Sequence, residues 1–368
     1  MTESNCISDF SMVLTEIIRE EEMKIVVLAG GISTERDVSL VSGTGVYNAL
    51  KKLGHDAVLL DVFMGYKGSI DNIFTKDYDW TKDIRKVSES APDIKKIKEI
   101  RGTNPNVLFG ENVLEICKEA DIVFMALHGD CGENGKIQAT FDLLDIKYTG
   151  TDYLSSALAM DKSITKSVFI QHSVNTPEGY VIYKNDDKKK LEPEFMPCVV
   201  KVCSGGSSVG VYIVNTSEEY FAALDEAFEY ENKVLVEKYI KGREVTDCVI
   251  NNEALPIVEI VAKDGVYDYK NKYQVGGAVE TCPAPLSDEL TEKVKTLALR
   301  AYDALGIKVY ARMDFIIDEN NEVYCLEANT LPGMTPTSLI PLEARTIGKS
   351  YEQLCQWIVE VSLEKYNS

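Results

Sequence analysis

Two runs near the carboxyl end of the chain, KVYARMDFII (308–317) and EVYCLEANT (322–330), decide the fold. Both runs are strand-like, and the letters between them, DENN, are typical of a turn. The chain is therefore expected to fold back at Asn320 as a β-hairpin. Such a hairpin would bring the polar residues of the two strands together.

The polar residues of this hairpin suit a metal site. Side chains alternate along a strand, so Arg312 and Asp314 share one face, and Glu327 and Asn329 share one face of the partner strand. Three oxygen ligands beside an arginine suit a hard divalent cation that carries phosphate. The same residues would also suit the wet side of an ordinary hairpin. The following loop, TLPGMTPTSL (330–339), favours the metal site because its hydroxyls and backbone N–H groups can wrap an anion.

Composition and charge limit the class of protein. The 368 residues are too many for one hydrophobic core of usual size and indicate two or three domains. With 45% hydrophobic and 27% charged residues, the composition is that of a soluble globular protein. The formal charge of −20 argues against a nucleic-acid or anionic-membrane surface, which would need clustered lysine and arginine.

The cysteines indicate a reducing compartment. The nine cysteines include no CxxC pair, and Cys198, Cys248 and Cys325 lie inside apolar runs, where they are expected to be small core residues. Residues 1–22 hold no long apolar run and are expected to be a poorly ordered extension rather than an export signal or a membrane span. Reduced thiols in a cytoplasm are therefore expected.

The chain begins with a β-α-β pattern. From Met23, KIVVLAGG reads as a buried strand, a helix follows the loop ISTERDVS, and DAVLLDV (56–62) reads as a second strand. This order indicates an α/β organisation. The run 121–127 reads as another strand, and the glycine-rich HGDCGENGK (128–136) is expected to be a loop at its carboxyl end. Ligands usually lie at that end of strands in an open parallel sheet.

The rest of the chain alternates strands and helices. Residues 63–118 read as an insertion of short elements, to which we assign no chemistry. Helices are expected within 153–172, 217–229 and 288–305, and strands at 198–202, 234–240, 244–251 and 255–262.

Several residues of this second part suit nucleotide binding. The loop GGSSVG (205–210) can cradle phosphate oxygens with its backbone N–H groups, although it lacks the Gly-Lys-Ser/Thr of a P-loop and also suits a plain turn. Lys201 in the preceding strand and Lys162 at a helix start can contact an anion or extend to solvent. Glu237 and Glu244 flank a connector that could bind adenine and ribose.

Six motifs stand in the order found in one family, and together they resemble the D-alanine–D-alanine ligases of the ATP-grasp superfamily. They are GGISTERDVS (30–39), ALHGDCGENGK (126–136), ALAMDK (157–162), GGSSVG (205–210), EKYI (237–240), and ARMDF (311–315) with LEANTLPGMTPTSL (326–339). The resemblance covers the chain from about Met23 to about Leu363.

The resemblance implies an ATP-grasp fold of the α/β (α+β) class, with nucleotide held between the central and C-terminal of three domains. The implied segments are the extension 1–22, an N-terminal substrate domain 23–150, a central domain 151–237, and a C-terminal catalytic domain 238–364 with a substrate loop at 268–284. A homodimer is usual in the resembling family.

The resemblance also implies a reaction. The family joins two D-alanines in the cytoplasm for the peptidoglycan stem peptide. ATP phosphorylates the carboxylate of the first, and the amine of the second attacks the acyl phosphate. Asp314, Glu327 and Asn329 would hold two Mg²⁺ ions, for which Mn²⁺ could substitute. Arg312 and the N–H of Gly333 would stabilise the oxyanion.

The resemblance assigns the remaining site residues. Glu35 would pair with the ammonium of the first D-alanine, with His128 near its carboxylate. Glu35, Ser207 and Tyr273 would form a hydrogen-bonded set that closes a loop over the substrates. The carboxylate of the second D-alanine would meet Lys272, Ser338 and Leu339. Contacts to ATP would come from Lys162, Lys201, Ser208, Glu237, Lys238, Ile240 and Glu244.

The departures and alternatives concern the flap and the second substrate. The family usually has proline where this chain has Val202, which puts the rigidity of the flap in doubt. Tyr273 in the substrate loop favours the dipeptide over D-alanyl-D-lactate or D-alanyl-D-serine. Another ATP-grasp carboxylate–amine ligase would lack the STERD glutamate, and a regulatory module without turnover would lack a metal carboxylate. Neither is lacking here.

Overall fold

The computed structural model describes most of the chain, namely residues 22–82, 92–187, 192–206, 209–262 and 277–367. Its strands form three sheets. Four predicted site residues lie outside the described residues: Ser207, Ser208, Lys272 and Tyr273. The same holds for most of the predicted extension and for most of the predicted substrate loop.

The first sheet has three parallel strands in the order β2-β1-β3. They are β1 (Lys24–Ala29), β2 (Asp56–Asp61) and β3 (Ile122–Met125), and α1 (Arg36–Lys52) packs against β1 and β2. Five of the six residues of β1 are buried, as a parallel strand covered on both faces requires. The predicted β-α-β start is confirmed.

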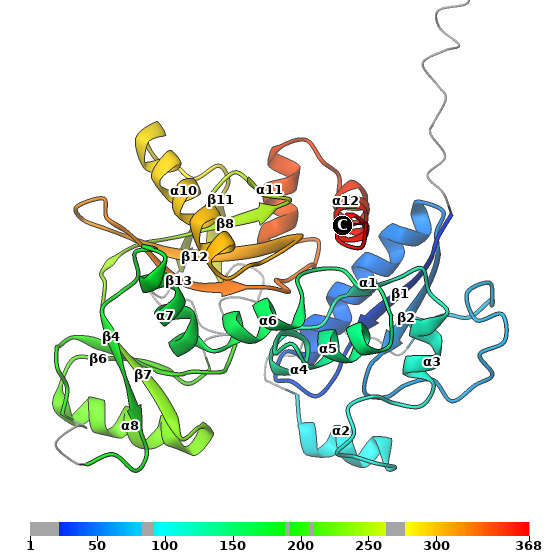
Figure 1. Cartoon of the computed structure of the whole chain (residues 1–368), viewed down its shortest axis with the longest axis horizontal. Coiled ribbons are helices and arrows are strands. Elements are labelled where there is room, and N and C mark those ends of the chain that lie inside the picture. Colours follow the sequence, from blue (N-terminus) through cyan, green and yellow to red (C-terminus); the bar gives the residue numbers. More distant parts are fainter. Residues whose placement is uncertain (1–21, 83–91, 188–191, 207–208, 263–276, 368) are drawn as a thin grey trace, which may run out of the picture.

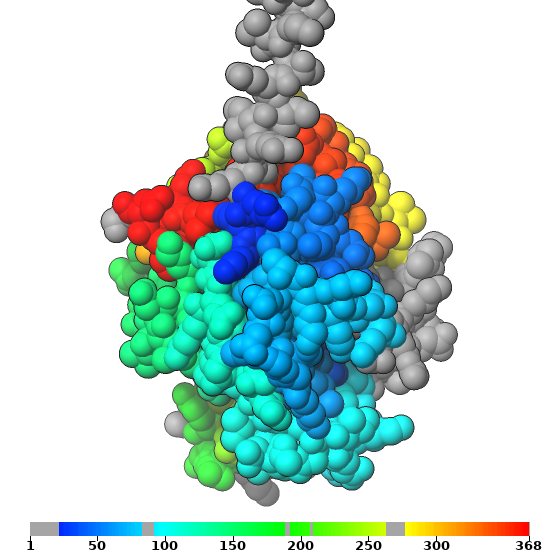
Figure 2. Space-filling view, turned by 90° about the vertical axis from the view of Figure 1, so that its right-hand side faces the viewer, coloured from blue at the N-terminus to red at the C-terminus, as the bar shows by residue number. Residues whose placement is uncertain are grey.

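The last helix of the chain, α12 (Tyr351–Glu364), returns to this first sheet and packs against α1 (Figure 1). Leu354 and Ile358 of α12 belong to the same hydrophobic core as Ile25 of β1. In the space-filling view, the start of β1 lies beside the C-terminal segment (Figure 2). The first core therefore combines the two ends of the described chain.

Short helices surround the first sheet: α2 (Ile94–Arg101), α3 (Val113–Lys118), α4 (Asp130–Glu133) and α5 (Lys136–Leu143). Residues 128–136, expected as a loop, contain α4 and the start of α5. Gly129 and Gly135 precede these helices with φ values of 70° and 82°, a backbone region that favours glycine. The prediction of a continuous loop here is therefore wrong.

Two helices connect the first sheet to the others. They are α6 (Tyr153–Met160) and α7 (Lys162–Gln171), and Asp161 stands between them. The Asp161 carboxylate accepts hydrogen bonds from the N–H groups of Ser163 and Ile164, which makes it the N-cap of α7. The predicted helical segment 153–172 is thus divided by a cap, which places Lys162 in the first turn of α7.

The second sheet is antiparallel, in the order β4-β7-β5-β6. Its strands are β4 (Gly179–Tyr183), β5 (Cys198–Val202), β6 (Val211–Val214) and β7 (Lys233–Lys238), and α8 (Ser217–Tyr230) covers one face. Along β5, Cys198, Val200 and Val202 are buried, while Lys201 projects from the opposite face. Alternation along this strand therefore turns Lys201 away from the core that α8 covers.

The third sheet has the strand order β11-β10-β8-β12-β13, with β9 paired to β8. Helix α10 (Asp288–Ala304) covers one face, and α11 (Leu339–Thr346) follows the hairpin. No helix in the described residues is long and apolar enough to cross a bilayer. The strands are β8 (Gly242–Ile250), β9 (Glu253–Ala254), β10 (Val258–Ala262), β11 (Ala278–Thr281), β12 (Tyr310–Asp318) and β13 (Val323–Asn329).

The predicted hairpin is formed by β12 and β13. Arg312 is opposite Asn329, and Asp314 is opposite Glu327. The alternate residues Ala311, Met313 and Phe315 of β12 are buried in the core against α10. The polar residues must then face the other side, so the register of the hairpin confirms that all four share one face.

Candidate active site

Asp314 is fixed from three directions on the polar face of the hairpin. Arg312 donates two hydrogen bonds to it, from Nε to Oδ1 and from Nη2 to Oδ2, both 2.8 Å long. Asn329 Nδ2 lies 3.1 Å from Asp314 Oδ2, and Thr246 Oγ1 of β8 lies 2.7 Å from Oδ1. The structure therefore brings Arg312, Asp314 and Asn329 together as the sequence predicted, and adds Thr246.

Glu327 completes the predicted metal ligands. It pairs with Asp314 across the hairpin, and its Oε2 lies 3.3 Å from Lys162 Nζ. The described residues hold no group of three or more His, Cys, Asp or Glu side chains that could bind a metal. The predicted set has two such side chains, Asp314 and Glu327, and its third ligand is the amide of Asn329. Two carboxylates and an amide oxygen form an all-oxygen set, which fits a hard cation such as Mg²⁺.

Lys201 and Lys166 enclose the carboxylate of Glu237. Lys201 Nζ lies 2.5 Å from Glu237 Oε2, and Lys166 Nζ lies 2.6 Å from Oε1, with the side chains of Lys166 and Glu237 only 7% and 3% exposed. Burial alone would raise the pKa of Glu237, but the two ammonium groups outweigh it and hold the pKa below its ordinary value. Glu237 is therefore an anion in the folded protein.

Lys166 is a site residue that the sequence analysis missed. It follows Lys162 by one helical turn on α7, and that i,i+4 spacing was the available signal. Burial lowers the pKa of Lys166, whereas for Lys201 the charges of Glu237, Glu327 and Glu244 outweigh burial and raise it. The charge of Glu327 on the β12-β13 hairpin thus acts on Lys201 together with that of Glu237.

The residues of the connector are placed as follows. Lys238 is exposed at the end of β7, and Ile240 is half-buried in the following turn. Glu244 lies near the start of β8, where it is opposite Ile316 of β12. The EKYI motif therefore leads directly from Glu237 to β8, the strand beside the β12-β13 hairpin.

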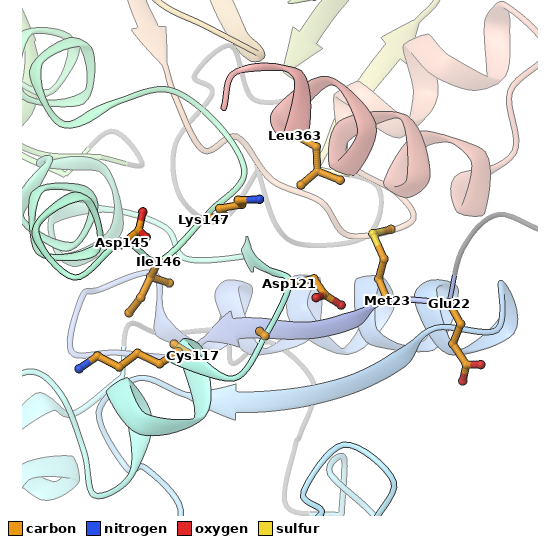
Figure 3. Close-up of a pocket in the computed structure, with 10 residues that line it drawn as sticks. Glu22, Met23, Cys117, Asp121, Asp145, Ile146, Lys147 and Leu363 are labelled. Carbon is orange, nitrogen blue, oxygen red and sulfur yellow. The ribbon is translucent and has the colours of Figure 1, made fainter. Parts of the chain in front are cut away.

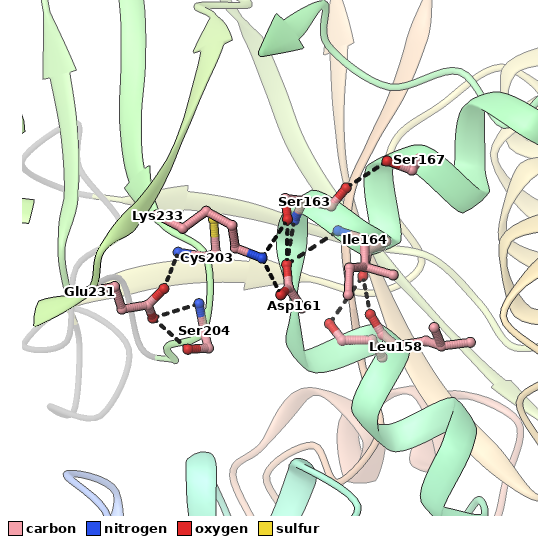
Figure 4. A network of polar contacts seen from close by, with 11 residues as sticks. Leu158, Asp161, Ser163, Ile164, Ser167, Cys203, Ser204, Glu231 and Lys233 are labelled. Atoms are coloured by element: carbon pink, nitrogen blue, oxygen red, sulfur yellow. Dashed lines mark hydrogen bonds and ion pairs between the residues drawn. The ribbon is translucent and has the colours of Figure 1, made fainter. Parts of the chain in front are cut away.

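The base of the GGSSVG flap is held by the carboxylate of Glu231 and by a backbone bridge to Asp161 (Figure 4). Glu231 accepts hydrogen bonds from the N–H groups of Cys203 (3.2 Å) and Ser204 (2.8 Å). Asp161 binds Lys233 Nζ at 2.5 Å and forms an isolated β-bridge with Ser204. These contacts fix Cys203 and Ser204, which directly precede the glycines of the flap.

Lys162 links the flap to the hairpin. Its Nζ donates to the carbonyl oxygen of Gly205 at 2.6 Å while it pairs with Glu327. Glu35 approaches the flap from the other side: an added Cβ on Gly206 would lie 2.5 Å from Glu35 Oε2, and one on Gly129 would lie 2.7 Å from the same atom. Glu35 Oε2 therefore lies close to both Gly206 of the flap and Gly129 after β3.

His128 is buried at the end of the first sheet. Its Nδ1 lies 2.8 Å from the carbonyl oxygen of Leu331, and its Nε2 lies 3.0 Å from Ser42 Oγ. Ser42 Oγ also accepts a hydrogen bond from the N–H of Met334 at 3.3 Å. Burial lowers the pKa of His128, although the charge of Glu35 acts in the opposite direction. A neutral His128 that donates from Nδ1 satisfies all of these contacts.

Glu133 is a second residue that the sequence analysis missed, although GENG follows a predicted strand. Its Oε2 accepts from the N–H of Gly129 at 2.7 Å, and its Oε1 accepts from the N–H of Leu331 at 3.2 Å. It therefore connects the loop of His128 to the loop that leads to Gly333. Burial, followed by the charge of Glu35, raises the pKa of Glu133 to about 8.

This raised pKa predicts a pH dependence of stability. The folded protein binds a proton on Glu133 more tightly than the unfolded chain, whose group has the ordinary value of 4.5. The stability that this proton contributes is complete below pH 4.5 and is lost as pH rises towards about 8. We expect Glu133→Gln to show a smaller fall in unfolding free energy over this window in urea titrations. An unchanged slope would show that Glu133 is ionised throughout.

The loop after the hairpin brings Gly333 and Ser338 together. A Cβ on Gly333 would lie 3.0 Å from Ser338 Oγ. Ser338 Oγ accepts from the N–H of Thr335 at 3.1 Å, and Ser338 is the N-cap residue of α11. Leu339 packs against the apolar residues of β10. Gly333, predicted for the oxyanion, and Ser338, predicted for the second substrate, therefore share one loop, and Leu339 begins the helix that follows.

A separate surface hollow of about 490 Å³ lies at the amino ends of β1 and β3 (Figure 3). Met23 precedes β1 and Asp121 precedes β3, whereas Glu35 and His128 follow the same two strands. Among the described residues, none of the predicted site residues lines this hollow. Glu35 and His128 therefore lie at the carboxyl ends of these parallel strands, as expected for an open parallel sheet.

Comparisons with known proteins agree with this geometry. Models described as D-ala D-ala ligase N-terminus and C-terminus match residues 24–151 and 167–360. The chain is 43% identical to a D-alanine–D-alanine ligase of Pediococcus pentosaceus, covering 92% of this chain and 97% of that one. For a ligase of Lacticaseibacillus casei the identity is 42%, covering 94% and 97%.

Solved structures give the same result. A D-alanine–D-alanine ligase from Bacillus anthracis, complexed with ATP, has a TM-score of 0.71 at 30% identity and covers 94% of this chain and 100% of that one. A ligase structure from Coxiella burnetii has a TM-score of 0.73 at 24% identity, covering 95% and 96%, which supports the fold alone. The expected ATP-grasp fold is confirmed, and the chain belongs to the D-alanine–D-alanine ligase family.

Proposed function

We propose that this chain joins two D-alanines to D-alanyl-D-alanine at the expense of ATP, for peptidoglycan precursor synthesis. One observation carries this function: the oxygen-rich hairpin face pairs with Lys162 through Glu327, and the charge of Arg312 on the same face reaches His128 and Glu133. A phosphate donor and an amino-acid carboxylate can therefore meet at the hairpin. Family membership supports the choice of D-alanine.

The reaction has two steps. A carboxylate oxygen of the first D-alanine attacks the γ-phosphorus of ATP, and ADP leaves with the electron pair of the broken P–O bond. The amine of the second D-alanine then attacks the acyl carbon, and the tetrahedral intermediate releases inorganic phosphate and a proton. Arg312 and the N–H of Gly333 would stabilise the oxyanion of that intermediate.

Asp314, Glu327 and Asn329 would hold the divalent metal. We propose two Mg²⁺ ions, for which Mn²⁺ can substitute. Bound there, the metal would neutralise charge on the transferring phosphoryl group. Arg312 would keep the Asp314 carboxylate oriented, because its two hydrogen bonds fix both oxygens.

The nucleotide and the amino acids would occupy opposite sides of the hairpin. On the nucleotide side, Lys162 and Lys201 would contact phosphates, and the proposed adenine and ribose contacts are Glu237, Lys238, Ile240 and Glu244. On the other side, Glu35 would bind the ammonium of the first D-alanine, and neutral His128 would lie near its carboxylate. Ser338 and Leu339 would meet the carboxylate of the second D-alanine. The proposed roles of Ser207, Ser208, Lys272 and Tyr273 concern residues outside the described part of the chain.

We also propose a cytoplasmic homodimer of three-domain subunits. The three sheets support three domains, which we propose at 23–150, 151–237 and 238–364, with nucleotide between the last two and with α12 of the last segment packed in the first core. Eight of the described cysteines are free, and seven of these are buried, which suits a reducing compartment. Sedimentation of the purified protein would test the dimer.

A substrate panel tests the proposed function. Phosphate release with ATP and Mg²⁺ is expected to rise at least about tenfold with D-alanine and to stay at the basal rate with L-alanine or D-lactate. Mass spectrometry of the product should give D-alanyl-D-alanine. Faster turnover with D-lactate or D-serine at neutral pH would identify a different second substrate. Phosphate release that no D-amino acid stimulates would contradict the ligase assignment.

A further inference from the structure

Two buried acids lie outside the site described above. Asp247 of β8 and Glu343 of α11 are both fully buried. Both oxygens of Asp247 and Oε1 of Glu343 have no hydrogen-bond partner in the structure. Burying carboxyl groups with so few partners is costly. Such a cost at the edge of an active site needs an explanation.

The remaining carboxyl oxygen, Oε2 of Glu343, accepts a hydrogen bond from the third sheet at a position that has no strand partner on the β9 and β10 side of β8. Strand β8 pairs with β9 through Val249 and Ile250, and with β10 through residues 244–246. Cys248 lies between these two stretches. Its carbonyl oxygen accepts from the N–H of Leu255 at 2.9 Å, and its N–H donates to Glu343 Oε2 at 2.9 Å. A helix side chain therefore replaces the missing strand partner.

This bond connects two parts of the proposed site. Cys248 is opposite Arg312 in the pairing of β8 with β12, so Glu343 is attached at the strand position next to Arg312. At the other end of the connection, α11 begins directly after Ser338. Glu343 follows Ser338 by five positions, or about 7.5 Å along the helix axis. The buried bond thus sets how far the start of α11 lies from Arg312.

We propose that Glu343 is a positioning residue for the second substrate, because it fixes the start of α11 relative to Arg312. This inference rests on the proposed function, in which Ser338 and Leu339 receive the carboxylate of the second D-alanine. Leu339 packs on Val258 and Ile260 of β10, so a shift of α11 would move Leu339 along that strand. The amine of the second substrate would then approach the acyl phosphate from a different position.

The protonation state of Glu343 guides the choice of variants. Burial, followed by the charge of Asp247, raises the pKa of Glu343 well above its ordinary value. A glutamine has the shape of the neutral acid and keeps one carbonyl oxygen for the N–H of Cys248. A methionine has similar volume but no acceptor. Glu343→Gln and Glu343→Met therefore separate the hydrogen bond from the packing.

Thr346→Val provides a matched control. Thr346 is on the same helix and donates to Cys282 Sγ at 3.2 Å, but it lies one turn further from Ser338. This substitution also removes a polar contact of α11. It should reduce stability without moving the start of the helix.

The experiment measures the two half-saturating concentrations of D-alanine and the KM for ATP. We expect Glu343→Met to raise the half-saturating concentration of the second D-alanine at least about tenfold. The half-saturating concentration of the first D-alanine and the KM for ATP should stay within about twofold of wild type. Glu343→Gln and Thr346→Val should stay within about twofold of wild type in all three. The proposal would be overturned if Glu343→Met raised all three constants equally, or if it left the half-saturating concentration of the second D-alanine unchanged. Wild-type protein that forms no D-alanyl-D-alanine would instead contradict the proposed function.

Discussion

Replacing Glu327 with glutamine is expected to reduce kcat by at least about 100-fold. The amide keeps the shape of the side chain but loses the charge that pairs with Lys162 at 3.3 Å and that would neutralise a divalent cation. Asp314 would remain fixed by Arg312, so the loss would come from the metal rather than from collapse of the hairpin. The half-saturating Mg²⁺ concentration in a phosphate-release assay should rise together with the fall in kcat.

Glu322→Gln is the matched control for this substitution. Glu322 is next to β13 at the turn end of the same hairpin, and it pairs with Lys293 at the surface, where both side chains are about half exposed. Exposed ion pairs contribute little to the stability of a folded protein. We expect kcat and the Mg²⁺ dependence of Glu322→Gln to stay within about twofold of wild type. Wild-type turnover in Glu327→Gln would show that the hairpin does not hold the metal.

The polar face of the β12-β13 hairpin could be predicted from sequence because its geometry is local. Strand alternation and a short turn are enough to place Arg312, Asp314, Glu327 and Asn329 on one face, and the structure has this register. A one-residue slip would turn these residues into the core that Met313 occupies. Burial of the apolar face therefore determines which residues form the polar face.

Contacts between distant segments could not be predicted in this way. Glu133 meets Leu331 across 198 positions, and Ser42 meets Met334 across 292. No periodicity in the chain encodes such pairs, because they depend on how the sheets pack. Glu343 is a clearer case still: its position on a short helix gives no sign that it completes a strand ladder at Cys248.

The same reasoning applies to Glu237, whose pairing with two lysines changes what its motif implies. The sequence suggested a carboxylate free for adenine or ribose. In the structure both of its oxygens are engaged, one by Lys201 and one by Lys166. A nucleotide contact by Glu237 would therefore have to share or replace one of these pairs.

Lys166→Met is expected to lower the free energy of unfolding by about 3 kcal/mol. The ammonium of Lys166 is buried, and it donates hydrogen bonds to Thr176 Oγ1 at 3.0 Å and to the carbonyl oxygen of Pro177. It is also one of the two cations that pair with the Glu237 carboxylate. Its removal leaves a buried carboxylate with one partner. Urea denaturation at neutral pH should show the loss. Lys308→Met removes a surface pair with a separation of 3.9 Å and should change stability by less than about 0.5 kcal/mol.

Acid titration separates the loss of charge pairing from the loss of packing in Lys166→Met. In wild type, the pKa of Glu237 lies below its ordinary value of 4.5, so the unfolded chain binds the proton more tightly than the folded protein. The stability gained from the ion pairs is complete above pH 4.5 and decreases as pH falls below it. Without Lys166, the pKa of Glu237 should move up towards its ordinary value, and this decrease should become shallower. If the variant loses stability by the same amount at every pH, the loss comes from packing and the buried pair contributes no net charge stabilisation.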